Sequence, residues 1–302
     1  MESAIYHTSV MLLPSVEGLN IKANGVYVDA TLGGGGHSRE ILSRLGSEGR
    51  LFSFDQDEDA ISRCGSGDRR WQLVRSNFRY LHNWMRYYGI DAIDGLLADL
   101  GVSGHHFDDA SRGFSYRQDA PLDMRMNQRA RSSAADVVNS YTADQLADIF
   151  RLYGELKQGR RLAAALVAAR TRKPVATTGE LAAIVSPLLG RDHESKDLAR
   201  VFQALRIEVN HEMDALRDLL RSATSLLRPG GRLVVMSYHS LEDRLVKNTM
   251  RAGNAEGIVE QDIYGRSAAP LRAIGKAVGP TPEEMAANPR SRSAKLRVAE
   301  KV

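Results

Sequence analysis

A run of four glycines and several acids at the ends of apolar segments are the parts of this sequence best suited to chemistry. The glycines occupy positions 33–36, and His37 follows them directly. Asp55 ends the next apolar segment, and Asp99 ends a later one. Glycines let a ligand approach the backbone closely, and a carboxylate can accept hydrogen bonds from both hydroxyls of a ribose. The combination predicts a site for a nucleotide-like ligand.

A βαβ unit is needed to bring these residues together. Residues 26–32 are rich in β-branched and aromatic side chains, which predicts a buried strand. Residues 38–45 have helical spacing of their apolar side chains, and residues 51–55 form a second strand that ends on Asp55. The alternative to ligand binding is a purely structural role, in which the glycines form a flexible turn and Asp55 caps the next helix. The full context of strand, turn, helix, strand and acid favours ligand binding.

The details of the turn indicate which ligand it binds. A dinucleotide fingerprint would have a third glycine where this chain has Ser38, and a phosphate-binding P-loop would have lysine where it has His37. Asp29, just before the turn, would repel a pyrophosphate and attract a cation. S-adenosylmethionine carries an ammonium and a sulfonium and no phosphate. The charges therefore favour this methyl donor over NAD.

Composition excludes several classes of protein. The chain has 302 residues, 43% hydrophobic and 26% charged, which is ordinary for a globular protein with a real core. Its single cysteine, Cys64, excludes an internal disulfide and a cysteine-based zinc site, and we expect no bound metal. No secretory signal and no membrane-spanning run are present, so we expect a cytoplasmic protein with no membrane partner.

The order of elements predicts an α/β fold with a helical insertion. Further strands are expected at residues 71–75, 93–99 and 232–237, with helices between them, and an edge strand at 294–299. Residues 111–206 contain no convincing strand. Five helices are expected there, at residues 134–138, 142–153, 160–171, 178–188 and 197–210. We therefore predict a Rossmann-like, mostly parallel sheet domain of residues 1–110 and 207–302, interrupted by an all-helical domain of residues 111–206.

Two segments are rich in basic residues. Residues 151–173 hold seven basic side chains and one acid, which fits a polyanion-facing surface about as well as a solvated helix face. Residues 266–302 hold eight basic and three acidic side chains, a net charge of +5 (8 − 3) against +4 for the whole chain. We interpret the second segment as a contact for nucleic-acid phosphates, because a merely solubilising tail would not end in a strand.

Parallel strands bring their carboxyl-end loops to one edge of the sheet. Two residues in these loops are candidates for binding the cofactor or the target base. Phe78 could stack on an adenine, although a lone aromatic in a turn is more often core. Asp99 lies where amino-methylating enzymes place an acceptor for the target amine, although a strand-end Asp is often only a cap. The amine of cytosine is a poor nucleophile, and an acceptor for its N–H can turn the lone pair toward a methyl donor. Residues 238–243 form either a target-side wall or an ordinary helix cap.

Long motifs span nearly the whole chain, at residues 7–10, 29–38, 55–57, 99–103, 112–115, 121–126, 202–207, 240–244 and 288–293. In these motifs and in their order, the sequence resembles the bacterial 16S ribosomal RNA cytosine-N4 methyltransferases. The resemblance implies a class I methyltransferase that uses S-adenosylmethionine, with an inserted helical domain that helps to bind RNA. It also implies N4-methylation of a cytidine in the decoding centre of 16S ribosomal RNA, within the small ribosomal subunit.

The resemblance assigns roles to particular residues. The cofactor contacts of the family fall on Gly35, Gly36, His37, Asp55, Phe78 and Asp99. A further contact, which is usually Gln after Ser-Ser-Pro, falls on His106, because this chain reads Ser-Gly-His-His at residues 103–106. Asp99 is the candidate catalytic residue that orients the amine. The candidate RNA contacts are His239, Arg290 and Arg292.

Other functions fit the sequence less well. DNA amino-methyltransferases typically show an Asp/Asn/Ser-Pro-Pro-aromatic motif, where this chain reads Asp-Leu-Gly-Val at residues 99–102. Ser38 and the basic terminal segment disfavour an NAD-dependent oxidoreductase, and a hydrolase would show a Gly-x-Ser-x-Gly elbow. A non-catalytic RNA-binding protein with a nucleotide fold remains open, and an inert Asp99 or an empty cofactor site would support it.

Overall fold

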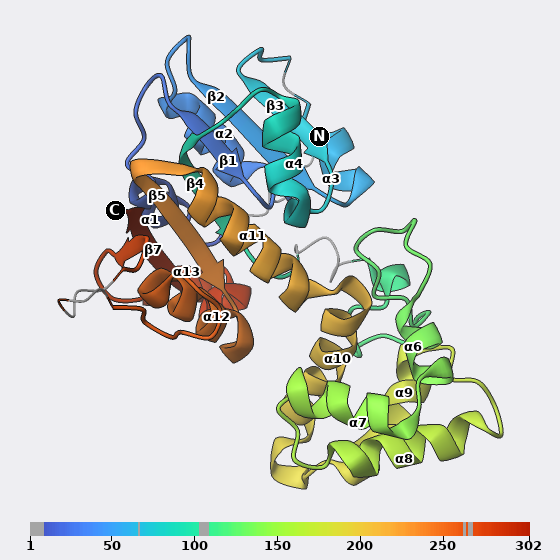
Figure 1. Cartoon of the computed structure of the whole chain (residues 1–302). Helices are drawn as coiled ribbons and strands as arrows, with labels where there is room; N and C mark the ends of the chain where they lie inside the picture. Colours follow the sequence, from blue (N-terminus) through green and yellow to red (C-terminus); the bar gives the residue numbers. More distant parts are fainter. Residues whose placement is uncertain (1–8, 66, 103–108, 262–263, 265–267) are drawn as a thin grey trace. The chain divides into compact units, whose positions relative to one another are not determined.

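The chain folds into two compact units. The computed structural model describes residues 9–65, 67–102, 109–261, 264 and 268–302 (Figure 1). Unit 1 comprises Met1–Gly101 and Met213–Val302, and unit 2 comprises Val102–Glu212. The boundaries expected from the sequence were 110/111 and 206/207. Unit 1 carries the sheet, and unit 2 carries a separate set of helices.

Unit 1 is built on a seven-stranded sheet in the order β3-β2-β1-β4-β5-β7-β6. The strands are β1 Val26–Asp29, β2 Arg50–Asp55, β3 Trp71–Arg75, β4 Ile93–Asp99, β5 Leu227–Ser237, β6 Leu271–Ala273 and β7 Lys295–Lys301. The first five strands are parallel to one another, while β7 pairs antiparallel with β5 and β6 pairs antiparallel with β7. The strand β7 was expected at the edge of the sheet, but β6 pairs with its outer side. The expected Rossmann-like, mostly parallel α/β sheet is confirmed. Strand order reverses between β1 and β4, which is where such sheets bind ligands.

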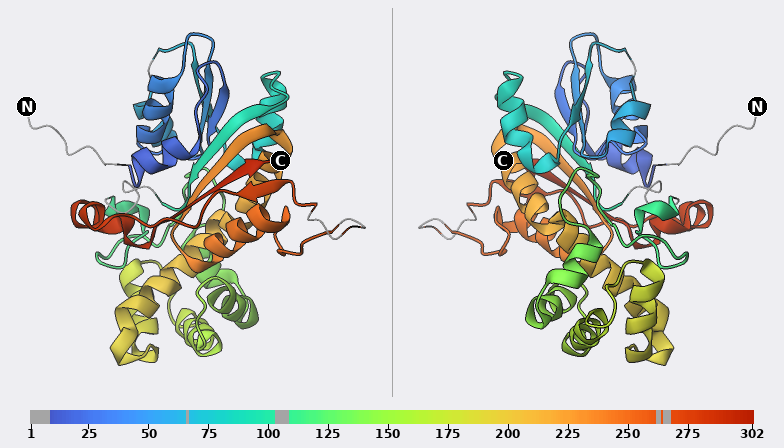
Figure 2. Two further views of the ribbon diagram at one scale, coloured as in Figure 1. Left: turned by 90° about the vertical axis from the view of Figure 1, so that its left-hand side faces the viewer. Right: turned by 90° about the vertical axis from the view of Figure 1, so that its right-hand side faces the viewer.

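Helices cover both faces of this sheet. The helices of unit 1 are α1 Leu12–Gly18, α2 Gly36–Arg44, α3 Glu58–Arg63, η1 Phe78–Tyr80, α4 Leu81–Tyr87, α11 Glu212–Leu226, α12 Ser240–Ala252, α13 Pro282–Ala287 and η5 Pro289–Ser293. Figure 2 shows α1 and α2 on one side of the sheet and α4 and α11 on the other. In the described part of the chain, no helix combines the length and the apolar character needed to cross a membrane.

The alternation of side chains along the strands places three acids on one face of the sheet. Tyr27 of β1 and Leu97 of β4 are fully buried in the core cluster that includes residues of α1 and α2. Side chains two residues apart in a strand share a face. Asp29 follows Tyr27 by two and Asp99 follows Leu97 by two, and Asp55 follows the same alternation in β2. The acids therefore share the α1–α2 face at the carboxyl ends of their strands.

Unit 2 has its own apolar core. Its helices are η2 Ala110–Arg112, α6 Ala134–Ser140, α7 Ala143–Leu152, α8 Gly159–Arg170, α9 Thr178–Val185, η3 Ser186–Leu188, η4 Arg191–His193 and α10 Glu194–Asn210. Between residues 109 and 212 the structure assigns no strand. Buried side chains of α7, α8 and α10, such as Phe150, Leu162 and Leu205, pack into one cluster. Because this cluster is built from residues of unit 2 alone, the unit has a core of its own.

Local signals for the helix starts were mostly correct. Thr142, where the sequence predicts that a helix starts, is the N-cap of α7 and forms a capping box with Gln145. The box at α9 begins one residue earlier than the predicted Thr178, because Thr177 accepts the hydrogen bond from the N–H of Glu180. The strand β6 was not predicted, because it has three residues, two exposed side chains and no apolar alternation. The strand β5 was predicted to begin at 232, whereas it begins at Leu227.

Candidate active site at the carboxyl edge of the sheet

The glycine turn after β1 is shaped by contacts with the protein itself. Gly33 and Gly35 have φ angles of +49° and +76°, which side chains with a Cβ rarely adopt. A Cβ on Gly36 would lie 2.0 Å from Ser9 Oγ, and one on Gly35 would lie 2.9 Å from Cys64 Sγ. A Cβ on Gly34 would meet nothing within 4 Å. Two of the four glycines thus allow close packing of the chain, and the turn leads into the N–H groups that open α2.

Asp55 is fixed against this turn. Its Oδ2 atom accepts a hydrogen bond from the N–H of Gly33 at 2.9 Å, and its Oδ1 atom accepts one from the N–H of Asp57 at 2.9 Å. A carboxylate has about four acceptor sites, and these bonds use one on each oxygen. The tip of β2 and the glycine turn are therefore held as one piece.

The loop carrying Phe78 is tied to the same edge. Asn77 Nδ2 donates to Gln56 Oε1 at 3.0 Å, which joins the loop after β3 to the residue that follows Asp55. Asn77 Oδ1 accepts from the N–H of Arg79 at 2.9 Å and so begins η1. The ring of Phe78 is half-buried. Asp55 and Phe78 are thus on adjacent, connected loops.

Asp29 lies beneath the turn. The side chain is fully buried, and it accepts hydrogen bonds from Ser38 Oγ at 2.6 Å and from the N–H of Thr31 at 3.1 Å. Burial is the main cause that raises the pKa of Asp29 to about 6, and the neighbouring His37 and the hydrogen bonds from Ser38 and Thr31 oppose the rise. Ser38 Oγ also lies 2.8 Å from Ser53 Oγ. These bonds explain why serine stands where a dinucleotide fingerprint has its third glycine.

His37 is enclosed, and its ring is oriented. Its Nε2 atom lies 3.1 Å from the carbonyl oxygen of Val10, and its Nδ1 atom lies 4.0 Å from Asp99 Oδ2. A carbonyl can only accept, so Nε2 carries the proton and the neutral ring presents a lone pair at Nδ1. Burial lowers the pKa of His37. The neutral ring therefore faces Asp99 without donating a hydrogen bond to it.

The surroundings of Asp99 bring the pKa of its carboxyl group close to neutral pH. Its Oδ1 atom accepts the hydroxyl of Tyr238 at 2.6 Å, and its own N–H donates to Thr31 Oγ1 at 2.7 Å. Burial is the main cause that raises the pKa of Asp99 to about 7, the charges of Glu242 and Glu284 add to the rise, and the Tyr238 bond opposes it. The side chain is 22% exposed, so it reaches the surface of the site.

Residues 238–243 form a helix cap, and they also contribute two side chains, Tyr238 and Glu242, that were not among the predicted site residues. His239, rather than Ser240, is the N-cap of α12. The buried Glu242 accepts a hydrogen bond from the N–H of Tyr238 at 2.8 Å and lies 3.2 Å from His239 Nε2. Tyr238 could have been found from its position, because it follows the strand next to the one that ends in Asp99. An RNA contact by His239 stays a prediction.

The remaining predicted contacts lie elsewhere. His106 falls outside the described residues. Arg290 and Arg292 are exposed on η5. In unit 2 several exposed basic side chains lie in and around α8, among them Lys157, Arg160, Arg161 and Arg172.

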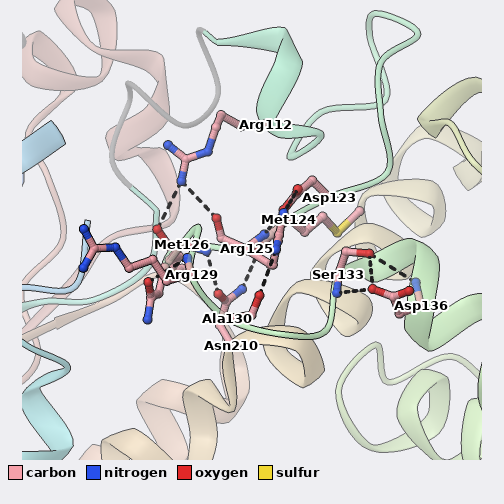
Figure 3. A network of polar contacts seen from close by, with 11 residues as sticks. Arg112, Asp123, Met124, Arg125, Met126, Arg129, Ala130, Ser133, Asp136 and Asn210 are labelled. Carbon is pink, nitrogen blue, oxygen red and sulfur yellow. Dashed lines mark hydrogen bonds and ion pairs between the residues drawn. The ribbon is translucent and has the colours of Figure 1, made fainter. Parts of the chain in front are cut away.

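The motifs at residues 112–115 and 121–126 are joined by hydrogen bonds at the start of unit 2. The buried Arg112 donates to the carbonyl oxygens of Arg125 and Met126 at 2.9 and 3.1 Å, and Arg125 pairs with Asp123 (Figure 3). Asn210 Oδ1, at the end of α10, accepts from the N–H of Met126 at 2.8 Å. The two motifs therefore have a structural role, because these bonds fix the loop at residues 112–126 against α10.

Comparison with known proteins gives one consistent result. The sequence model of the MraW methylase family matches residues 4–302. Three relatives carry the name ribosomal RNA small subunit methyltransferase H. The one from Parabacteroides distasonis is 61% identical over 100% of this chain and 99% of its own length. The one from Bacteroides fragilis is 59% identical over 99% of both chains, and the one from Phocaeicola vulgatus is 59% identical over 98% of both.

Proposed function

This chain belongs to the MraW methylase family, and we propose that it transfers the methyl group of S-adenosylmethionine to the N4 amine of a cytidine in the decoding centre of 16S ribosomal RNA. The full-length relatives, named for methyl transfer to small-subunit ribosomal RNA, support the substrate. The observation that carries the chemistry is the position of Asp99. Its partly exposed carboxylate ends β4, next to the glycine turn and at the reversal of strand order.

The residues at this edge fit S-adenosylmethionine. We expect Asp55 to accept the ribose hydroxyls, Phe78 to stack on the adenine, and the backbone of residues 35–37 to contact the cofactor. The carboxylates of Asp29 and Asp99 supply negative potential for a ligand that carries two positive groups and no phosphate. When bound, the cofactor supplies an electrophilic methyl group on a sulfonium. We also expect Asp99 to contribute to cofactor affinity, as the family's motif implies.

Asp99 would make the target amine reactive by orienting it. The nitrogen lone pair of the cytosine amine is delocalised into the ring, so the amine attacks poorly unless an acceptor holds its N–H. A carboxylate oxygen at the end of β4 can accept that N–H and direct the lone pair toward the methyl group. Such positioning can supply much of the rate enhancement of an in-line transfer. This role needs no metal and no strong base.

We assign RNA recognition to two basic surfaces. The exposed basic side chains in and around α8 support RNA binding by unit 2, and Arg290 and Arg292 support phosphate contacts by unit 1. The finer proposal is that the substrate is ribosomal RNA within the small subunit, encountered in the cytoplasm. An assembled subunit would present the decoding-centre strand in a fixed conformation, which favours specific placement of one cytidine.

Radioactive methyl transfer tests this function. The protein is incubated with tritium-labelled S-adenosylmethionine and one of three acceptors from cells that lack the enzyme: assembled small subunits, naked small-subunit RNA or large subunits. We expect label in small-subunit RNA, with faster transfer to the assembled subunit. Absence of label on all three RNAs, despite measured cofactor binding, would contradict the proposed substrate. Faster transfer to naked RNA would contradict the finer proposal.

A further inference from the structure

Tyr238 and Asp99 come together because their strands end side by side. Asp99 of β4 pairs with Met236 of β5, and the N–H of Leu100 donates to the carbonyl oxygen of Met236 at 3.1 Å. Tyr238 is two residues beyond Met236, and its hydroxyl reaches Asp99 Oδ1 at 2.6 Å. A short O–H···O bond to a carboxylate is among the strong hydrogen bonds of proteins.

Tyr238 is held through both its backbone and its ring. Glu242 of α12, which is 3% exposed, accepts the backbone N–H of Tyr238 at 2.8 Å. The ring is partly buried and packs against the apolar cluster that includes Met236. The hydroxyl is therefore carried by a residue whose backbone is hydrogen-bonded and whose ring is packed.

The two oxygens of Asp99 have different surroundings. Oδ1 accepts the Tyr238 hydroxyl, whereas Oδ2 accepts no hydrogen bond from the residues that the structure describes. His37 Nδ1 lies 4.0 Å from Oδ2, and in the neutral ring that atom has only a lone pair to offer. Oδ2 is thus the oxygen with capacity to accept a hydrogen bond from a ligand.

We propose that Tyr238 is a positioning residue for methyl transfer, whose hydroxyl holds Asp99 through Oδ1 and leaves Oδ2 to take the proton that the target amine loses. The proposal rests on the proposed function. The amine nitrogen forms a bond to the methyl carbon as the bond from that carbon to sulfur breaks, and the electron pair of the broken bond stays on sulfur. One N–H proton then passes to Asp99 Oδ2 and later to solvent, so the methylated amine leaves neutral.

The groups around Asp99 determine its pKa, and the Tyr238 hydroxyl is one of them. In the part of the chain that the structure describes, the titratable groups around this carboxyl, besides Tyr238, are His37 of α2, Asp29 of β1, Glu242 of α12 and Glu284 of α13. The burial of the site and the acids Glu242 and Glu284 favour the protonated form, whereas the Tyr238 hydroxyl favours the carboxylate. Removal of the hydroxyl should therefore raise the pKa of Asp99 further above its ordinary value.

Tyr238→Phe keeps the ring and removes the hydroxyl. The Asp99 carboxyl carbon is followed by ¹³C NMR through a pH titration of the cofactor-free protein, and the pH profile of single-turnover methyl transfer is measured in parallel. A hydrogen bond to a charged group corresponds to a pKa change of about one to two units. We expect both the Asp99 pKa and the acidic limb of the rate profile to move up by that amount, with KM for RNA little changed. The control is Tyr87→Phe, which removes a hydroxyl from a side chain that is 75% exposed.

A second substitution keeps the test valid if Tyr238→Phe folds poorly. Incorporation of 3-fluorotyrosine at position 238 makes the hydroxyl a better donor, so the pKa of Asp99 should fall instead of rise. An Asp99 pKa that is unchanged in both proteins would overturn the proposal. The titration needs neither cofactor nor RNA. If only the proposed function is wrong, the Asp99 pKa should still shift as predicted in both proteins, but no methyl group should be transferred to RNA. That result differs from an unchanged Asp99 pKa, which would overturn the role of Tyr238.

Discussion

The N–H of Gly33 donates to Asp55 Oδ2 at 2.9 Å, which joins the glycine turn to the tip of the neighbouring strand. The carboxylate proposed to bind the ribose is thus also part of the turn that faces the cofactor. Asp55→Asn keeps the size of the side chain but removes its charge and one acceptor. We expect the Kd for S-adenosylmethionine, measured by calorimetry, to rise roughly 10- to 150-fold, as expected when a hydrogen bond to a charged group is removed.

The matched control is Asp91→Asn, the same change at an exposed residue just before β4. Its Kd should equal that of the unchanged protein. An Asp55→Asn protein that binds the cofactor with undiminished affinity would remove the ribose assignment.

The stability of unit 1 should depend on pH through Asp99. Its pKa is raised to about 7 in the folded protein from an ordinary value of 3.8, so the folded state binds this proton more tightly than the unfolded state. The contribution of Asp99 to stability is therefore full below about pH 4 and is lost as pH rises through about 7. Asp99→Asn removes this dependence. Between pH 4 and pH 8 the free energy of unfolding of the variant should therefore fall less than that of the unchanged protein, by on the order of 3 kcal/mol.

Urea denaturation at the two pH values measures this difference. Both tryptophans, Trp71 and Trp84, lie in unit 1, so their fluorescence reports on that unit. Equal pH dependence in Asp99→Asn and in the unchanged protein would show that the carboxyl is not held in its protonated form by burial.

The exposed arginines of η5 should contribute to RNA affinity through phosphates. A double substitution, Arg290→Ala with Arg292→Ala, removes two positive charges. The slope of log K against log salt concentration should become shallower by roughly 0.7 to 0.9 for each phosphate that the variant no longer neutralises. The control is Arg69→Ala, an exposed arginine before β3 at the opposite, amino-terminal end of the strands. A salt slope that is unchanged in the double variant would place the phosphate-binding residues elsewhere.

Gly113 should be intolerant of any side chain. Its φ is +70°, and a Cβ there would lie 2.2 Å from the carbonyl oxygen of Pro121, in the loop that Arg112 stabilises. Gly89 has a similar φ of +67° but nothing within 4 Å of its Cβ position. Gly89→Ala should cost about 1–2 kcal/mol, the usual penalty of this backbone conformation. Gly113→Ala should cost clearly more, and equal melting temperatures of the two variants would refute the steric explanation.

Much of the fold is predictable from this sequence because its signals are local. The strands that end in Asp55 and Asp99 are mostly apolar and are buried except at their ends, which is typical of parallel strands covered on both faces. The capping box at Thr142 is likewise a short-range pattern. The three-residue β6 has no such pattern, since its pairing with β7 is set by the neighbouring strand.

The candidate site is only partly predictable, because its polar contacts join distant residues. The glycines suggest close approach of a ligand, but Gly36 is packed against Ser9, 27 positions earlier in the chain. The sequence indicates that Asp29 attracts a cation near the turn, but it does not show that the side chain is fully buried and bonded to Ser38. Tyr238 and Asp99 are 139 residues apart, and only the adjacency of β4 and β5 shows that they bond.

The most direct test of the central claim is the identity of the modified atom. Small subunits from cells that lack the enzyme are incubated with the protein and trideuteromethyl S-adenosylmethionine, and the RNA is digested to nucleosides for tandem mass spectrometry. We predict one cytidine that gains the trideuteromethyl group on its exocyclic nitrogen, with no gain when Asp99 is replaced by alanine. A label on the ring carbon, on the ribose hydroxyl or on another base, or full labelling by the Asp99→Ala protein, would contradict the account.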